Sequence, residues 1–126
     1  MHNWELISNS PVKMFGFGEE EHRQVYGDEH KGKFSHELIA GAASFEAARI
    51  FEKDQRKEGK PVSHGFAKEM LAGIAGGEVD KLFETKGLDY LDRDRATAEA
   101  TSRVQQGYDE HYGRHEDWRP DHPPPF

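Results

Sequence analysis

The chain has 126 residues, a formal net charge of −7 and no cysteine. This length predicts one domain, and the missing cysteines exclude disulfide frameworks, thiolate zinc sites and cysteine nucleophiles. No run of about 18 apolar residues occurs, so we expect no membrane span. The acidic balance argues against nucleic acid as a partner, because that surface requires clustered Lys and Arg. With no secretory signal in its first residues, we expect a cytoplasmic protein.

Apolar residues concentrate in the centre of the chain. Leu, Ile, Val and Phe number 23 in all, and 15 of them lie within residues 34–91. This distribution predicts a single helical domain over residues 15–113, preceded by a flexible segment at 1–14. The polar, Pro-rich segment 114–126 is expected to be disordered, because it offers little apolar surface to bury.

All the predicted elements are helices, since no stretch shows the apolar alternation typical of strands. Ser35 and Ser63 are predicted N-cap residues of two long helices, which end where Gly59 and Gly87 interrupt the pattern. A third long helix ends at Gly113, and acidic residues indicate the start of a shorter N-terminal helix. In chain order, the predicted helices span 19–30, 35–57, 63–86 and, starting at Leu88 or Asp92, residues up to 112. The predicted fold class is an all-α helical bundle.

The two central helices repeat each other at an offset of 32 residues. Residues 37–43 (ELIAGAA) align with 69–75 (EMLAGIA), and further along Glu46 aligns with Glu78. A linker of about five residues between such helices predicts an antiparallel hairpin. The bundle is therefore expected to be built on this hairpin.

Glu46 and Glu78 occupy matching positions at the centre of an apolar stripe on their helices, when successive residues are placed about 100° apart. A buried carboxylate must be paired, hydrogen-bonded, metal-bound or protonated. Three alternatives follow. Arg49, Lys81 or another helix neutralises the glutamates; the two faces meet in a homodimer whose register the glutamates set; or the carboxylates form a site for a metal ion or a small polar ligand.

A carboxylate-bundle metal site takes a Glu from two helices and a Glu-x-x-His motif from each of the other two. Glu46 and Glu78 match the first pair, and Glu19 with His22 forms one motif, but the last helix supplies none. His111 continues the apolar stripe of that helix, where we interpret it as a partly buried residue and, alternatively, as a ligand. The candidate binding residues are therefore Glu46, Glu78, His22 and His111. The metal candidates are Glu19, His22, Glu46 and Glu78, and the cofactor is unknown.

Small residues recur within the two central helices. A glycine inside a helix costs about 1 kcal/mol relative to alanine, so several together suggest a spatial demand, either from a neighbouring helix or from a ligand. We interpret Gly41, Gly73, Gly76 and Gly77 as positions where helices pack closely within the bundle. A homodimer through the same small-residue faces is the alternative.

Five segments carry a family resemblance: FGFG at 15–18, YGDEHK at 26–31, SHELIAGAA at 35–43, PVSH at 61–64 and EVDKLFETKGLD at 78–89. Together they resemble the fungal CipC-like antibiotic-response family. The resemblance implies a small, intracellular, stress- or antibiotic-responsive protein. It implies no reaction, cofactor or catalytic residue.

Two hypotheses follow for the function. The first is a stress- or antibiotic-responsive helical protein that we expect to be non-enzymatic. The alternative is a small-molecule-binding or metal-binding protein, enzymes included, that uses the inward-facing carboxylates of Glu46 and Glu78.

Overall fold

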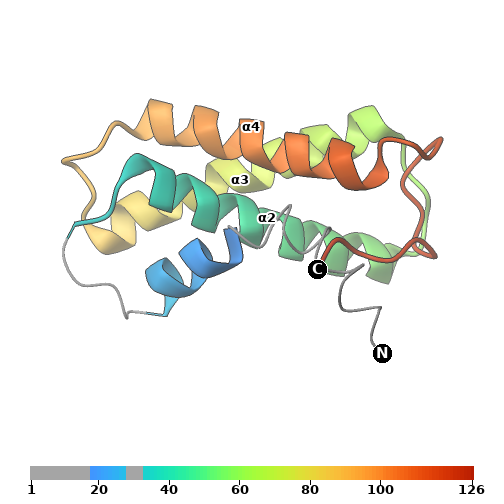
Figure 1. Ribbon diagram of the computed structural model, residues 1–126, viewed down its shortest axis with the longest axis horizontal. Helices are drawn as coiled ribbons and strands as arrows, with labels where there is room; N and C mark the ends of the chain where they lie inside the picture. The colour runs from blue at the N-terminus through green and yellow to red at the C-terminus, as the bar shows by residue number, and fades with distance from the viewer. Residues whose placement is uncertain (1–17, 28–32) are drawn as a thin grey trace.

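The computed structural model describes residues 18–27 and 33–126, so the segment predicted at 1–14 lies outside it. Figure 1 shows three long helices side by side, consecutive ones running in opposite directions. They are α2 (His36–Glu58), α3 (His64–Lys86) and α4 (Arg93–Tyr112), and each packs against the other two. Residues 18–26 form a shorter helical segment, and the predicted all-α bundle is confirmed. No helix in the described part of the chain has the length and apolar character needed to cross a bilayer.

The long helices begin and end where their capping residues place them. The hydroxyl groups of Ser35 and Ser63 each accept a hydrogen bond of 3.1 Å from the backbone N–H of the residue three positions later in the chain. Gly59 and Gly87 end α2 and α3 with φ angles of 75° and 64°, a left-handed conformation that glycine adopts without steric cost. Asp92 caps α4, so of the two predicted starts the later one is correct.

The N-terminal half of α2 is buried on all sides. All eight residues from 38 to 45 are buried, and because eight residues make more than two turns, every face of α2 is covered here. The single apolar stripe predicted for this helix is therefore too narrow. The covering elements are α3, α4 and the segment 18–26. The helical period of α2 alone does not predict that the segment 18–26 packs against it.

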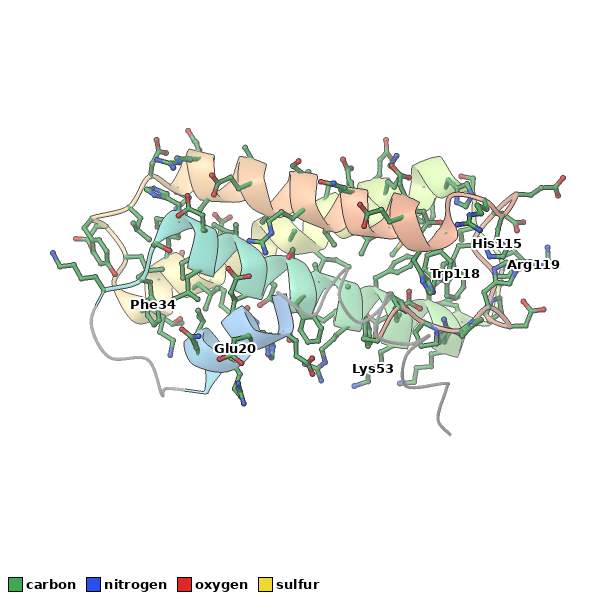
Figure 2. All side chains as sticks on the ribbon, in the orientation of Figure 1. Glu20, Phe34, Lys53, His115, Trp118 and Arg119 are labelled. Carbon is green, nitrogen blue, oxygen red and sulfur yellow. The ribbon has the colours of Figure 1, made fainter. Side chains whose placement is uncertain are left out.

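The segment 114–126 packs on the bundle, contrary to the disorder predicted from its composition. Trp118 is fully buried, and its indole ring lies 5.6 Å from the ring of Phe51 in an edge-on contact. Trp118 and Val62 also exchange two backbone hydrogen bonds of 2.9 and 3.0 Å. One large aromatic residue thus anchors a segment that is otherwise polar, far along the molecule from Glu20 (Figure 2).

The predicted close packing of glycines occurs at only part of the repeat. A Cβ atom on Gly41 would lie 1.8 Å from the carboxylate of Glu21, and one on Gly76 would lie 3.7 Å from Thr97. For Gly73 and Gly77, nothing in the described chain beyond the neighbouring backbone of α3 lies within 4 Å of that position. The prediction was wrong for these two, because their side of α3 does not face a neighbouring helix of the described chain.

Candidate functional site

The helical segment 18–26 packs tightly against α2. A Cβ atom on Gly18 would lie 3.0 Å from the carbonyl oxygen of Gly41 and 3.2 Å from Cβ of Phe45, so a larger residue would fit here only if the two backbones moved slightly apart. Val25 is fully buried in the same contact layer. The segment is thereby held in place along α2, and it carries His22 and Tyr26 toward the two long helices.

His22 binds the first of the two predicted carboxylates. Its Nε2–H donates to Oε1 of Glu46 at 2.6 Å, and Arg49 donates to the same oxygen at 2.9 Å. The side chains of His22 and Glu46 are 19% and 21% exposed. Glu46 is therefore largely shielded and doubly partnered, which removes most of the cost of placing a carboxylate on this face.

Tyr26 binds the second carboxylate. Its hydroxyl donates to Oε1 of Glu78 at 2.6 Å, and Lys81 lies 3.4 Å from the other oxygen. Burial raises the pKa of Tyr26 well above its ordinary value, and the hydrogen bond and charge of Glu78, followed by the charge of Glu46, raise it further. Tyr26 therefore stays protonated and acts as a hydrogen-bond donor. The negative charges of both glutamates act on this side chain.

The rings of this site form a connected aromatic surface. His22 stacks on Tyr26 with 4.4 Å between ring centroids and meets Phe45 at 5.3 Å; Phe45 meets Phe126 at 5.6 Å. They border an open cavity of about 640 Å³, within the range of about 300–1,000 Å³ common for small-molecule sites. The residues that line this cavity are Glu19, His22, Arg23, Tyr26, Gly27, Phe45, Arg49 and Phe126.

A buried ion pair supports the segment from the opposite side. Arg103 of α4 donates to Glu21 at 2.8 Å and to the carbonyl oxygen of Glu37 at 3.0 Å. Burial raises the pKa of Glu21 to about 7, although the positive charge of Arg103 acts in the opposite direction. The missing side chain of Gly41 makes room for this carboxylate. The segment is thus fixed by polar contacts on both of its flanks.

The structure brings together three of the four candidate binding residues. Glu46 and Glu78 bind the two members of the stacked His22–Tyr26 pair, and Glu19 lies at the edge of the cavity. His111 does not belong to the site: its Nε2–H donates to the carbonyl oxygen of Pro123 at 2.8 Å. The apolar stripe of the last helix correctly predicted that the side chain of His111 is half-buried. It did not predict which part of the bundle this side chain contacts.

The candidate metal residues do not gather into a ligand set. Among the described residues, no group of three or more His, Asp or Glu side chains has the arrangement that holds a metal ion. The Nε2–H group of His22 instead forms a hydrogen bond with the carboxylate of Glu46.

Sequence reasoning missed two contributors to the site. Tyr26 follows His22 by four residues, which places both side chains on one helical face, and this spacing is the signal that identifies the pair. Phe126 has no local signal, because its contact with Phe45 depends on how the segment 114–126 returns along the bundle.

The chain can now be compared with known families. Residues 21–111 match the family described as Virulence factor CipC-like. The chain belongs to the CipC-like family. No curated protein and no solved structure matches it. The CipC-like match includes His22, Tyr26, Glu46 and Glu78, whereas Phe126 lies beyond the matched residues.

Proposed function

We propose that this CipC-like protein is a non-enzymatic small-molecule-binding protein whose ligand occupies the cavity beside His22 and Tyr26. The observation that carries the proposal is the aromatic surface of this cavity, whose rings are held by carboxylates from two different helices. Small-molecule sites are typically concave, largely apolar and equipped with a few fixed polar groups. This cavity is open to solvent, and it has the largely apolar lining and the fixed polar groups of such sites.

The two glutamates are proposed to position the rings more than to contact the ligand. Glu78 has a side chain that is 8% exposed, and its hydrogen bond to Tyr26 fixes the phenol ring. Glu46 fixes the imidazole of His22 in the same way. Side chains that are already ordered lose little conformational entropy when a ligand binds, and this favours affinity.

Nuclear magnetic resonance of the ¹⁵N-labelled full chain tests the proposal, with a set of small aromatic compounds as probes. We expect amide shifts that saturate and that cluster at His22, Tyr26 and Phe45. F45L should weaken binding, because it removes one ring of the cavity, whereas F66L changes a ring on a different surface and should not. Shifts scattered over the surface, or equal affinities in F45L and the unchanged chain, would contradict the proposal.

E46Q separates positioning from folding. The amide keeps a hydrogen bond to His22 but loses the charge that strengthens it, so we expect weaker ligand binding with an unchanged helical content in circular dichroism. The same comparison with E69Q, an exposed residue of α3, controls for the change in net charge. If E46Q and E69Q bind the aromatic probes equally tightly, the proposed role of Glu46 in positioning His22 is wrong.

We further propose, on the basis of the family resemblance, that the protein is an intracellular stress- or antibiotic-responsive protein of a fungus. The expected result is an increase in its abundance after the source cells are exposed to an antibiotic. An immunoblot normalised to total protein measures this, with untreated cells as the reference. Constant abundance under every stress applied would contradict this part of the proposal and would leave the binding proposal unaffected.

A further inference from the structure

The positive charges that line the cavity are already compensated. Arg49 is bound to Glu46 at 2.9 Å, and Arg23 forms an ion pair with Glu20 on its own helical segment. Glu19, by contrast, forms no ion pair or hydrogen bond with another described residue, and it lies at the edge of the same cavity. The cavity therefore offers a charged ligand one carboxylate without an ion-pair partner among the described residues, whereas both of its guanidinium groups are already paired.

The groups behind the rings add to this negative potential. Glu46 and Glu78 lie directly behind His22 and Tyr26, and the charges of both raise the pKa of Tyr26. Lys81 offsets Glu78 only from 3.4 Å, with a side chain that is 64% exposed to solvent. Arg49 offsets Glu46, so the carboxylates of Glu78 and Glu19 carry the excess negative charge near the rings, in agreement with the formal net charge of −7.

We propose that the ligand of this cavity is an amphipathic organic cation, that is, a protonated amine or quaternary ammonium group attached to a hydrophobic body. This inference rests on the proposed function. The faces of Tyr26, Phe45 and Phe126 attract a cation through their ring quadrupoles, and their apolar surface packs against its hydrophobic part. Glu19 supplies the opposite charge at the rim.

An organic anion fits the cavity less well. To bind Arg49 it must approach the carboxylate of Glu46, which already accepts from one N–H group of that guanidinium. To bind Arg23 it must likewise approach Glu20. In each case the anion meets a like charge beside the guanidinium group that it binds, whereas a cation meets the carboxylate of Glu19 at the rim, so the existing contacts favour a cation by charge.

Three probes with one ring system test the inference: 2-naphthylmethylamine as the cation, 2-naphthalenemethanol as the neutral compound and 2-naphthoate as the anion. Titration of the full chain at low salt, followed by fluorescence and amide shifts, should give the tightest binding for the amine. A single cation–π contact corresponds to a preference of about two- to five-fold over the neutral compound. The naphthoate should bind most weakly.

E19Q and E69Q form a matched pair of variants. Each removes one exposed carboxylate, but only Glu19 borders the cavity. E19Q should weaken binding of the amine by about two- to five-fold, the size expected for one exposed ion pair, and should leave binding of the neutral compound unchanged. E69Q should change neither, and thermal unfolding verifies that both variants remain folded.

The outcomes separate this inference from the proposed function. If the neutral compound binds as tightly as the amine and F45L weakens both, the cavity binds small molecules but the charge preference is wrong. Tightest binding of the naphthoate, or an equal effect of E19Q and E69Q, also overturns the inference. If none of the three probes binds at the cavity, the inference and the proposed function both fail.

Discussion

Two tyrosines each donate a short hydrogen bond to a glutamate on a distant helix. Tyr26 binds Glu78 at 2.6 Å, and Tyr112 binds the buried Glu52 at 2.7 Å. The pKa of Tyr112, like that of Tyr26, is raised by burial first and then by its glutamate. Each pair satisfies a buried donor and a buried acceptor together, so the loss of the tyrosine hydroxyl leaves a buried carboxylate with one hydrogen bond fewer.

Y26F should destabilise the protein by about 1.5–3 kcal/mol, because it leaves the carboxylate of Glu78 without its hydroxyl donor. Urea unfolding followed by circular dichroism measures the change. Y90F is the control, since Tyr90 is 47% exposed and its hydroxyl accepts from the exposed backbone N–H of Phe34 at 2.9 Å, so its loss leaves no buried charge. Adding E78Q to Y26F should restore part of the loss, because the uncompensated charge is then removed. Equal stabilities of Y26F and Y90F would contradict the importance of this bond.

Glu21 makes the stability depend on pH near neutrality. Its pKa in the folded chain is about 7, compared with an ordinary value of 4.5. Between these two values the folded chain keeps a proton that the unfolded chain has lost, so the free energy of unfolding should fall as the pH rises through this window. Above about pH 7 this contribution should no longer change.

E21Q should remove this part of the pH dependence, because glutamine does not titrate. Urea midpoints of the unchanged chain and of E21Q, compared between about pH 5 and about pH 7.5, measure the difference. E84Q changes an exposed carboxylate of α3 and should keep the original slope. The same slope in E21Q would show that Glu21 does not titrate in this window.

At the scale of elements, the site depends on how closely the segment 18–26 approaches α2. Gly18 allows the two backbones to approach, and Gly41 accommodates the side chains of the Glu21–Arg103 ion pair. Gly73 occupies the position equivalent to Gly41 in the sequence repeat, but nothing in the described chain beyond the neighbouring backbone of α3 lies within 4 Å of the place that a Cβ atom would take there. The two aligned glycines therefore have different environments despite similar surroundings in sequence.

G41A and G73A should consequently have opposite effects. A methyl group at Gly41 would displace the buried ion pair, so we expect a loss of about 1–3 kcal/mol, the usual cost of overpacking. At Gly73 the methyl group meets nothing in the described chain beyond the neighbouring backbone of α3 and alanine is the better helix former, so we expect a gain of up to about 1 kcal/mol. Chemical denaturation of both variants tests this directly. Equal stabilities would show that Glu21 moves aside without cost.

At the scale of the whole molecule, the segment 114–126 links one end of the bundle to the candidate site. Arg56 of α2 donates to the carbonyl oxygens of Pro120 and His122 at 2.6 and 2.7 Å, and its guanidinium group lies 5.2 Å from the ring centroid of Trp118. The same segment delivers Phe126 to the cavity, and Figure 1 shows the C-terminus drawn back from that end along the bundle. Arg56 therefore connects the packing of this segment with the shape of the candidate site.

R56M should loosen the segment while the three long helices remain. Methionine keeps much of the apolar stem but can donate neither to the two carbonyl oxygens nor to the buried carboxylate of Glu52, which Tyr112 still binds. Limited digestion with chymotrypsin, followed by mass spectrometry, should show faster cleavage after Trp118 than in the unchanged chain. K53M, an exposed substitution on the same helix, should be cleaved at the original rate. Unchanged cleavage of R56M would mean that burial of Trp118 alone holds the segment.

The sequence predicted well whatever depends on neighbouring residues. Ser35, Ser63, Gly59 and Gly87 act within four residues along the chain, so the caps and bounds of α2 and α3 followed from local patterns. The helical period also indicated that Glu78 faces inward, where its side chain is 8% exposed. Neither signal depends on the rest of the fold.

The tertiary structure alone decided which groups meet. The partners of His22, Tyr26 and Glu21 lie 24, 52 and 82 residues away in the sequence. No cap or helical period specifies contacts over such separations, because they depend on the relative placement of whole helices. For the same reason composition misjudged the segment 114–126: the burial of Trp118 requires a surface that α2 and the linker between α2 and α3 build together. Local chemistry therefore determined the helices, and their packing determined the site.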